Sequence, residues 1–244
     1  MNLETPKLKI KATLFKQHST ELAMFILPSN VLRRISYVLP RTHDNPEEIQ
    51  RLLSVKRLRE IGTYIKRSGS LIPNCVVVNL LPNVQVQRGA IANEATIIFP
   101  SDGSQNQGKA VTDPDNKYAY IIDGQHRVVG FDYAGGTVFE LPIVALLNED
   151  SSVCAKIFAD INSKQVKVGA ILLQAIKMQI GDLSKNEETA AKLVVRLGHS
   201  NDSPLRDRIK FPESLGNPSI SSDTLRKVLQ PLVAADGALY EVTT

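Results

Sequence analysis

The run YIIDGQHRVVGF at residues 120–131 places four polar side chains and a glycine directly after an apolar stretch. Its order predicts a strand, a tight turn at Asp123-Gly124 and then a short helix. The first N–H groups of a helix lack acceptors within it and carry partial positive charge, so such a turn attracts phosphate. A loop that holds an anionic ligand is therefore one interpretation of these residues.

Four residues of this run have chemical properties that suit an anion-binding loop. Arg127 offers a planar fork for phosphate oxygens, and His126 can donate to an anion or transfer a proton near neutral pH. Gly124 tolerates positive φ and lets the backbone approach a ligand. Asp123 could cap the helix, orient Arg127 or His126, or hold a Mg²⁺ ion. The other interpretation is a purely structural turn, because Asp-Gly is a common turn dipeptide. The residues alone leave both open.

Other candidate constellations are weaker. Asn162 and Gln165 stand three apart near the end of a predicted helix, where amides can bind a base or a backbone group but also cap helices. No Walker pattern, paired cysteines, His-x-x-x-His or nucleophile elbow occurs. His18, His43 and His199 lie in isolated polar contexts and are expected at the surface.

Composition places the chain among ordinary globular proteins, with 43% hydrophobic and 22% charged residues in 244. No apolar stretch approaches the roughly 18 residues that cross a bilayer, and the first residues lack a signal-peptide layout. Cys75 and Cys154 lie in separate apolar runs, which favours buried thiols over a disulfide or a metal site. These features predict a cytoplasmic protein without a membrane partner.

Positive charge is concentrated in one segment. Nine Lys or Arg and four Asp or Glu lie between Arg33 and Arg67, a balance of +5 against +4 for the whole chain. The segment could be an electrostatic footprint for nucleic acid, with Arg51, Lys56, Arg57 and Arg59 as the contacts. A solvated helix face explains the same charges.

Hydrophobic periodicity predicts an α+β amino-terminal half and a helical carboxy-terminal half. Expected strands cover residues 8–14, 21–27, 75–81, 95–99, 117–122 and 141–147. A helix is expected from a cap at Asn45, with Pro46 and Glu48 completing the start signal, to Ser68-Gly69. Further helices are expected at 125–133, 152–162, 169–180, 186–197 and 223–232, with no strand after residue 148. The predicted domains are therefore 1–148 and 149–244.

The pentapeptide Asp123-Gly124-Gln125-His126-Arg127 resembles the motif of the DGQHR-domain proteins, the DndB-like family. Three further pieces follow the family order between about residues 8 and 180: the basic helix around QRL (50–52) and RLR (57–59), the strand PNCVVVN (73–79), and FADINSKQ (158–165). The resemblance implies a ParB/sulfiredoxin-like amino-terminal domain with a mixed sheet and a helical region after it. Family chains are often longer, so either a short member or a truncated chain is expected.

The resemblance also implies a site. In the relatives the equivalent turn cradles the phosphates of a nucleoside triphosphate, which assigns nucleotide contacts to Gly124, Gln125, His126 and Arg127, with Asn162 and Gln165 as a second polar signature. Asp123, His126 and Arg127 become the catalytic candidates, with Mg²⁺ on Asp123. Sulfiredoxin needs a cysteine in this turn, where this sequence has Gln125, so sulfinic acid reduction is not expected.

The function implied is that of a nucleotide-binding protein, an ATPase (for ATP or another NTP with Mg²⁺), in a DNA-modification and phage-defence system. The system would perform DNA phosphorothioation or, as for the DpdB-type members, 7-deazaguanine insertion. Related DGQQR proteins of restriction systems are nucleotide hydrolases. DNA, the modification enzymes of the same operon and a second copy in a homodimer are the implied partners. The alternative is a non-catalytic DNA-binding regulator of a phosphorothioation operon.

Overall fold

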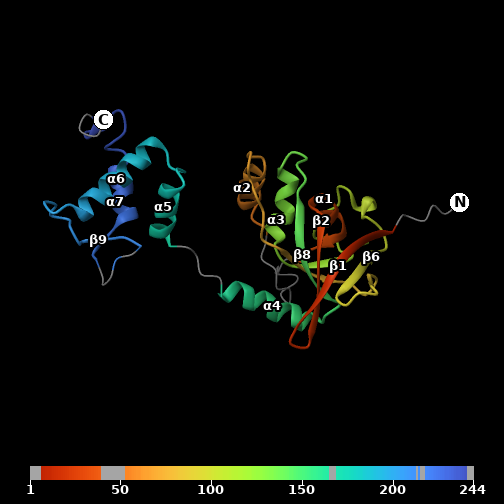
Figure 1. Cartoon of the computed structure of the whole chain (residues 1–244). Coiled ribbons are helices and arrows are strands. Elements are labelled where there is room, and N and C mark those ends of the chain that lie inside the picture. The colour runs from red at the N-terminus through yellow and green to blue at the C-terminus, as the bar shows by residue number, and fades with distance from the viewer. Residues whose placement is uncertain (1–6, 40–52, 165–168, 213, 215–217, 241–244) are drawn as a thin grey trace. The chain divides into compact units, whose positions relative to one another are not determined.

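A computed structural model describes residues 7–39, 53–164, 169–212, 214 and 218–240. The chain divides into two units, Met1–Lys164 and Gln165–Thr244. Sequence character changes near residue 148, but the helix that follows this point belongs to the first unit, so the units divide after Lys164. Figure 1 shows the elements of each unit.

The first unit is built on one mixed, eight-stranded sheet, whose order is β3-β7-β4-β8-β2-β1-β6-β5. The strands are β1 (Leu8–Gln17), β2 (Thr20–Pro28), β3 (Ser36–Tyr37), β4 (Val76–Leu80), β5 (Gln85–Arg88), β6 (Glu94–Phe99), β7 (Ala119–Asp123) and β8 (Glu140–Leu147). Strands β3 and β7 pair in parallel, as do β4 and β8, and the other neighbours are antiparallel. The expected mixed sheet is confirmed.

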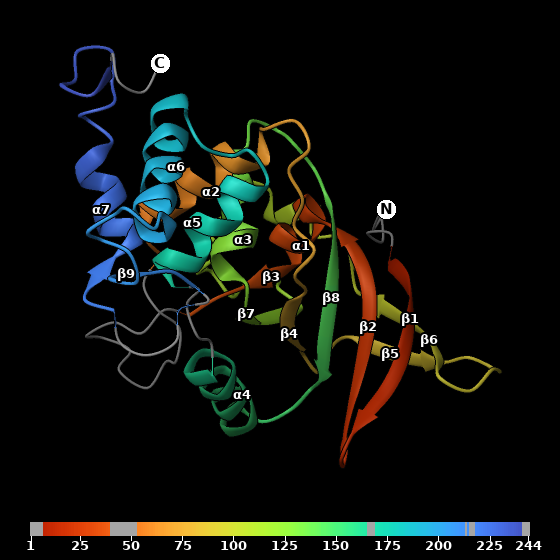
Figure 2. The same ribbon diagram turned by 60° about the vertical axis from the view of Figure 1, so that its left-hand side comes forward.

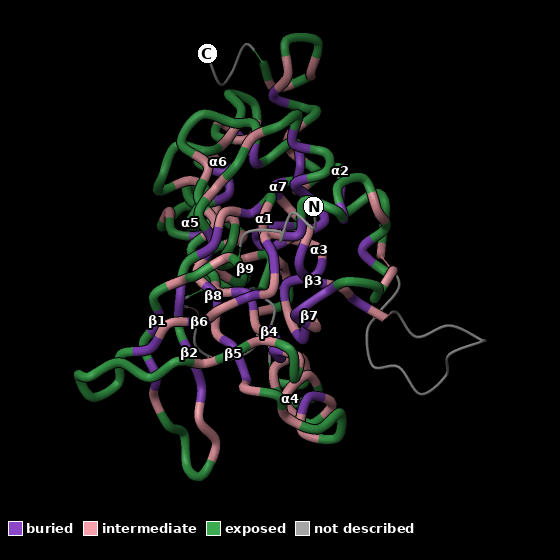
Figure 3. The backbone as a smooth tube through the Cα atoms, turned by 90° about the vertical axis from the view of Figure 1, so that its right-hand side faces the viewer, coloured by how far each residue is buried: buried purple, intermediate pink, exposed green. Residues whose placement is uncertain are grey.

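Alternating side chains let this sheet bury both faces. In β8, Ile143 and Ala145 belong to the larger hydrophobic core, whereas Val144 and Leu146 belong to a smaller cluster. The helices α1 (Ser29–Ile35), α2 (Val55–Ile65) and α3 (Gln125–Gly130) contribute to the larger core, and α4 (Ser151–Lys164) contributes to the smaller one. Helices therefore cover opposite faces, as Figure 2 shows. The β1–β2 and β5–β6 turns are exposed (Figure 3).

The basic helix differs from its predicted extent. It was expected to run without interruption from Asn45 to Ser68, and residues 40–52 lie outside the described part. Helix α2 begins at Val55, because Ser54 is extended (φ −82°, ψ 110°) and caps it through a hydrogen bond from Arg57 N to Ser54 Oγ of 3.4 Å. The expectation of one continuous helix was wrong, since an extended Ser54 ends any helix that precedes it.

The second unit contains the predicted helices. They are α5 (Ala170–Gln179), α6 (Lys185–His199) and α7 (Ser222–Leu229). A capping box between Ser184 and Glu187 starts α6, and Arg226 of α7 lies 3.5 Å from the Glu187 carboxylate. The unit also holds a parallel pair of two-residue strands, β9 (Ile209–Lys210) and β10 (Ile220–Ser221), which the sequence did not indicate. Among the described residues, no helix has the length and apolar character to span a membrane.

Candidate functional site

The turn between β7 and α3 has a left-handed glycine at its centre. Gly124 adopts φ 98° and ψ 9°, in the left-handed region. Its carbonyl accepts hydrogen bonds from Arg127 N at 2.9 Å and Val128 N at 3.0 Å, which starts the helix. A Cβ at this position would lie 3.2 Å from both Arg127 Nη2 and Val76 Cγ2. The positive φ therefore favours glycine here, as the sequence predicts, and the two close neighbours would have to shift to admit a Cβ.

Arg127 braces this turn from within. Its Nη2 donates to Asp123 Oδ2 at 2.7 Å, and its Nη1 donates to the carbonyl oxygens of Asn74 and Cys75, both at 2.8 Å. The two carbonyls precede β4, which pairs antiparallel with β7. One guanidinium therefore joins the entry of β4 to the exit of β7. Both side chains are partly buried, at 22% exposure for Arg127 and 28% for Asp123, which strengthens the pair relative to a surface one.

His126 connects the turn to the start of the basic helix. The backbone N–H of Ser54 donates to His126 Nε2 at 3.3 Å, so Nε2 acts as an acceptor in this arrangement. A neutral ring with this acceptor carries its proton on Nδ1. Gln125, beside it, is buried at 6% exposure, whereas His126 is only partly buried. His126 is thus the side chain of the turn that combines titratable chemistry with access.

Two glycines hold α2 tightly against α3 and the short turn η2 (Phe131–Tyr133). A Cβ on Gly130 would lie 2.5 Å from Ile61 Cγ2, and one on Gly62 would lie 2.6 Å from the Cβ of Tyr133. Leu58 and Ile65 of α2 are buried in the same interface with the core. This packing fixes the position of Ser54, and through it the contact with His126.

The basic side chains of α2 face solvent. Lys56, Arg57 and Arg59 are exposed, and no described carboxylate lies within 4 Å of their charges. Lys56 and Arg59 line a shallow hollow of about 560 Å³ together with Arg67. Arg51, the fourth predicted contact, lies outside the described residues. Both interpretations of this segment, nucleic-acid footprint and solvated face, fit this arrangement.

The second polar signature is only partly described. Asn162 donates from Nδ2 to the Phe158 carbonyl at 2.8 Å, one turn back in α4, so this amide is engaged within its own helix. Phe158 packs with Ile122 of β7, and α4 therefore lies against the strand that leads into the turn. Gln165 lies outside the described residues. In the described part of the chain, no group of three or more His, Cys, Asp or Glu is arranged to hold a metal ion.

Sequence reasoning missed the partners that shape the turn. Ser54 is 72 residues from His126, and the carbonyls of Asn74 and Cys75 are 53 and 52 residues from Arg127. Main-chain acceptors leave no residue-type signature, so no pattern in the sequence could identify the last two. The available signal for Ser54 was its serine type, since serine is a preferred helix cap.

Comparison with known proteins gives a family. The model of the DndB family, described as DNA-sulfur modification-associated, matches residues 10–193, which is most of the chain and confirms the resemblance. A solved structure, the C-terminally truncated chromosome-partitioning protein ParB from Caulobacter crescentus complexed with CTP-gamma-S, is similar with a TM-score of 0.38. The identity is 15%, over 68% of this chain and 68% of that chain. No curated protein matches the chain.

Proposed function

Because the chain belongs to the DndB family, which is associated with DNA-sulfur modification, we propose that it is a nucleotide-binding component of such a system. The nucleotide site is the turn from Asp123 to Arg127. The observation that carries this proposal is the braced left-handed turn at Gly124, which holds its shape through three hydrogen bonds from one arginine. A preformed turn of this kind binds phosphate without having to order its own backbone.

Within this proposal, the residues of the turn have roles that differ from those implied by the resemblance. Arg127 and Asp123 bind one another, so they support the proposal as residues that fix the turn. His126, which is only partly buried, is then the side chain that we assign to the phosphates. His126 becomes the candidate for donating to a phosphoryl oxygen through Nδ1–H, because its Nε2 accepts from the Ser54 N–H.

The turn offers few protein ligands for a magnesium ion. Asp123 is the single carboxylate of the turn, and its Oδ2 already accepts from Arg127 at 2.7 Å. Oδ1 is the atom left to bind the ion, and most other ligands would come from phosphate oxygens and water, as is usual for Mg²⁺. When bound, the ion would supply charge neutralisation on the phosphates. We propose hydrolysis of ATP or another NTP on this basis, with His126 near the transferred group.

Nucleotide binding and hydrolysis are tested together. We expect the wild-type chain to bind ATP and to release labelled phosphate, and His126→Ala to lose most of both. Lys9→Gln is a matched control, because Lys9 is exposed on β1, far from the turn in sequence, and forms no ion pair with another described residue. Binding without hydrolysis would identify a nucleotide sensor, whereas an unaltered His126→Ala would contradict this site.

A second function, that of a DNA-binding regulator, is favoured by one observation. The exposed cations Lys56, Arg57 and Arg59 have no carboxylate partner among the described residues, whereas Arg33, Arg88 and Arg127 do. Cations that contact DNA phosphates make binding fall steeply with salt. A gel-shift series over salt concentration, with Lys56→Gln and Arg59→Gln together, would test this function. Unchanged retardation in the double variant would exclude this face of α2 as the DNA-binding surface.

A further inference from the structure

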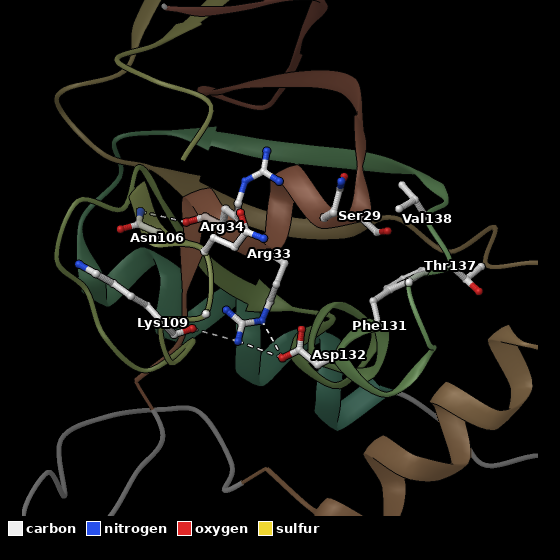
Figure 4. Close-up of a pocket in the computed structure, with 13 residues that line it drawn as sticks. Ser29, Arg33, Arg34, Asn106, Lys109, Phe131, Asp132, Thr137 and Val138 are labelled. Atoms are coloured by element: carbon white, nitrogen blue, oxygen red, sulfur yellow. Dashed lines mark hydrogen bonds and ion pairs between the residues drawn. The ribbon is translucent and has the colours of Figure 1, made fainter. Parts of the chain in front are cut away.

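A hollow of about 420 Å³ lies between α1, the loop after η1 (Ser104–Asn106) and the segment from η2 to Val138. Figure 4 shows its lining residues, with Arg33 extending from α1 toward Asp132 of η2 and toward the carbonyl of Lys109. It shares no lining residue with the Asp123–Arg127 turn. Its volume suits one small ligand, since such sites usually measure roughly 300–1,000 Å³.

Three cations line the hollow, and each has a carboxylate nearby. Asp132 of the lining pairs with Arg33 at 3.0 Å, whereas Asp102 and Asp113 lie outside the lining, 3.4 Å from Arg34 and 3.9 Å from Lys109. Arg33 donates from Nε to Asp132 Oδ2 at 3.0 Å, and its Nη2 lies 3.0 Å from the same oxygen and donates to the Lys109 carbonyl at 3.3 Å. Its Nη1 has no acceptor among the described residues, so this edge of the guanidinium can donate to a ligand.

Two glycines with left-handed backbone line the same hollow. Gly108 and Gly136 have φ 79° and φ 87°, and a Cβ on either would meet nothing within 4 Å. Neither backbone N–H donates to a described residue. Open main-chain amides in left-handed turns are a common way to bind phosphate oxygens. Phe131 and Val138 add an apolar wall on which the body of a ligand can rest.

A buried lysine lies next to the hollow. Lys117, 2% exposed, donates to the Arg34 carbonyl at 2.9 Å, and Asn106 of the lining donates to the same oxygen at 3.1 Å. Burial, with a contribution from the charges of Arg33 and Lys109, lowers the pKa of Lys117 to about 8. Asn106 Oδ1 is buried and has no partner in the described part of the chain, so it can accept from a hydroxyl or a water.

From these contacts, we propose that this hollow binds a terminal phosphate monoester, through Arg33, Lys109 and the amides of Gly108 and Gly136. The ligand is either a free nucleoside monophosphate or the 5′-phosphate end of a DNA strand, which share this group. The site is separate from the proposed nucleotide turn, and neither proposal depends on the other.

The test is an NMR titration of the ¹⁵N-labelled chain that follows the amides of Gly108 and Gly136. Inorganic phosphate and AMP are expected to shift both resonances, and adenosine, which lacks the phosphate, is not. A 5′-phosphorylated trinucleotide and its unphosphorylated form distinguish the strand end from the free nucleotide. No shift with phosphate or AMP at millimolar concentration would overturn the proposal.

Three variants test whether phosphate and AMP bind in the hollow. Lys109→Gln removes one charge but keeps the carbonyl that holds Arg33, and Val138→Trp fills the space at a side chain that is 47% exposed. Each is expected to weaken AMP binding about tenfold. Asp132→Asn removes the competing carboxylate and is expected to tighten binding several-fold, which a damaged fold could not produce.

The controls separate this hollow from the turn. His126→Ala and Lys9→Gln are expected to leave the Gly108 and Gly136 shifts unchanged. Loss of the shifts in His126→Ala would place the phosphate at the turn and overturn the proposal. The same conclusion would follow if affinity were equal in wild type, Lys109→Gln and Asp132→Asn.

Discussion

Arg127 Nη2 lies 2.7 Å from Asp123 Oδ2, so the first and last residues of the DGQHR pentapeptide are bound to one another across the turn that they enclose. The other nitrogen, Nη1, donates to two main-chain carbonyls that precede β4. The motif therefore supplies the ion pair that stabilises its own turn. The ion pair between these two side chains shapes the loop, and of the residues between them Gly124 and Gln125 are buried, whereas His126 is only partly buried.

Replacing Arg127 should cost stability. Arg127→Ala leaves the Asp123 carboxylate and two carbonyls without their donor, and we expect a loss of about 2–4 kcal/mol in the free energy of unfolding. Arg127→Lys should lose less stability than Arg127→Ala, because an ammonium keeps the charge. Some loss should remain, because an ammonium cannot reach three oxygens in a fork geometry. Urea denaturation followed by circular dichroism measures both. The control is Arg59→Ala on the exposed face of α2, expected within about 0.5 kcal/mol of wild type.

Gly124→Ala should destabilise the turn for two reasons. The φ of 98° is unfavourable for alanine, and the new Cβ would lie 3.2 Å from Val76 Cγ2. Gly69→Ala separates the two causes, because Gly69 has φ 78° and a Cβ added there would meet nothing within 4 Å. We expect about 1–2 kcal/mol for Gly69→Ala from backbone strain alone, and a larger loss for Gly124→Ala. Equal losses in thermal or urea unfolding would show that crowding contributes nothing.

The close approach of α2 and α3 should make Gly130 intolerant of a side chain. Alanine there would place its Cβ 2.5 Å from Ile61 Cγ2, and we expect a cost of about 1–3 kcal/mol. Ile61→Ala removes the atom that it meets, so the double variant should be more stable than the sum of the two single losses predicts. A double-mutant cycle by urea denaturation measures this coupling. Strict additivity would contradict the packing described here.

Lys117 should make stability depend on pH in an alkaline window. Burial lowers its pKa from the ordinary 10.5 to about 8 in the folded chain. Between these two values the unfolded chain binds more protons, so raising the pH across this window should stabilise the folded state. Lys117→Met should be more stable than wild type at pH 7 and should lose this part of the pH dependence. Unfolding measured from pH 7 to pH 10.5 in both proteins is the test, and parallel profiles would contradict a buried, titrating Lys117.

Much of the sheet could be predicted because its strands carry local signals. The alternation from Leu8 to Leu14, the β-branched run before Leu81 and the apolar run ending at Ile122 all became strands. Helix α1 and the strands β3 and β5 were missed. Helix α1 has seven residues and follows Pro28 without a side-chain cap, so it lacks the periodicity and start signal on which prediction depends.

The site could be predicted in part. The left-handed glycine and the strand–turn–helix order followed from Asp123-Gly124 itself. The hydrogen bonds from Arg127 to the start of β4 could not be predicted, because their acceptors are main-chain carbonyls more than 50 residues away in the sequence. The same physical reason explains the wrong helix boundary, since the extended Ser54 is stabilised by a contact with His126 that no local pattern records. Long-range hydrogen bonds, rather than residue types, decide both features.

The most direct test of the central claim is an equilibrium titration of wild type and His126→Ala with a fluorescent ATP analogue, after both have been shown to unfold at the same urea concentration. Binding at the Asp123–Arg127 turn predicts saturable binding by wild type and an affinity at least about tenfold weaker for His126→Ala, the loss of one charge-assisted hydrogen bond. Equal affinities for the two proteins, or no binding by wild type, would contradict it.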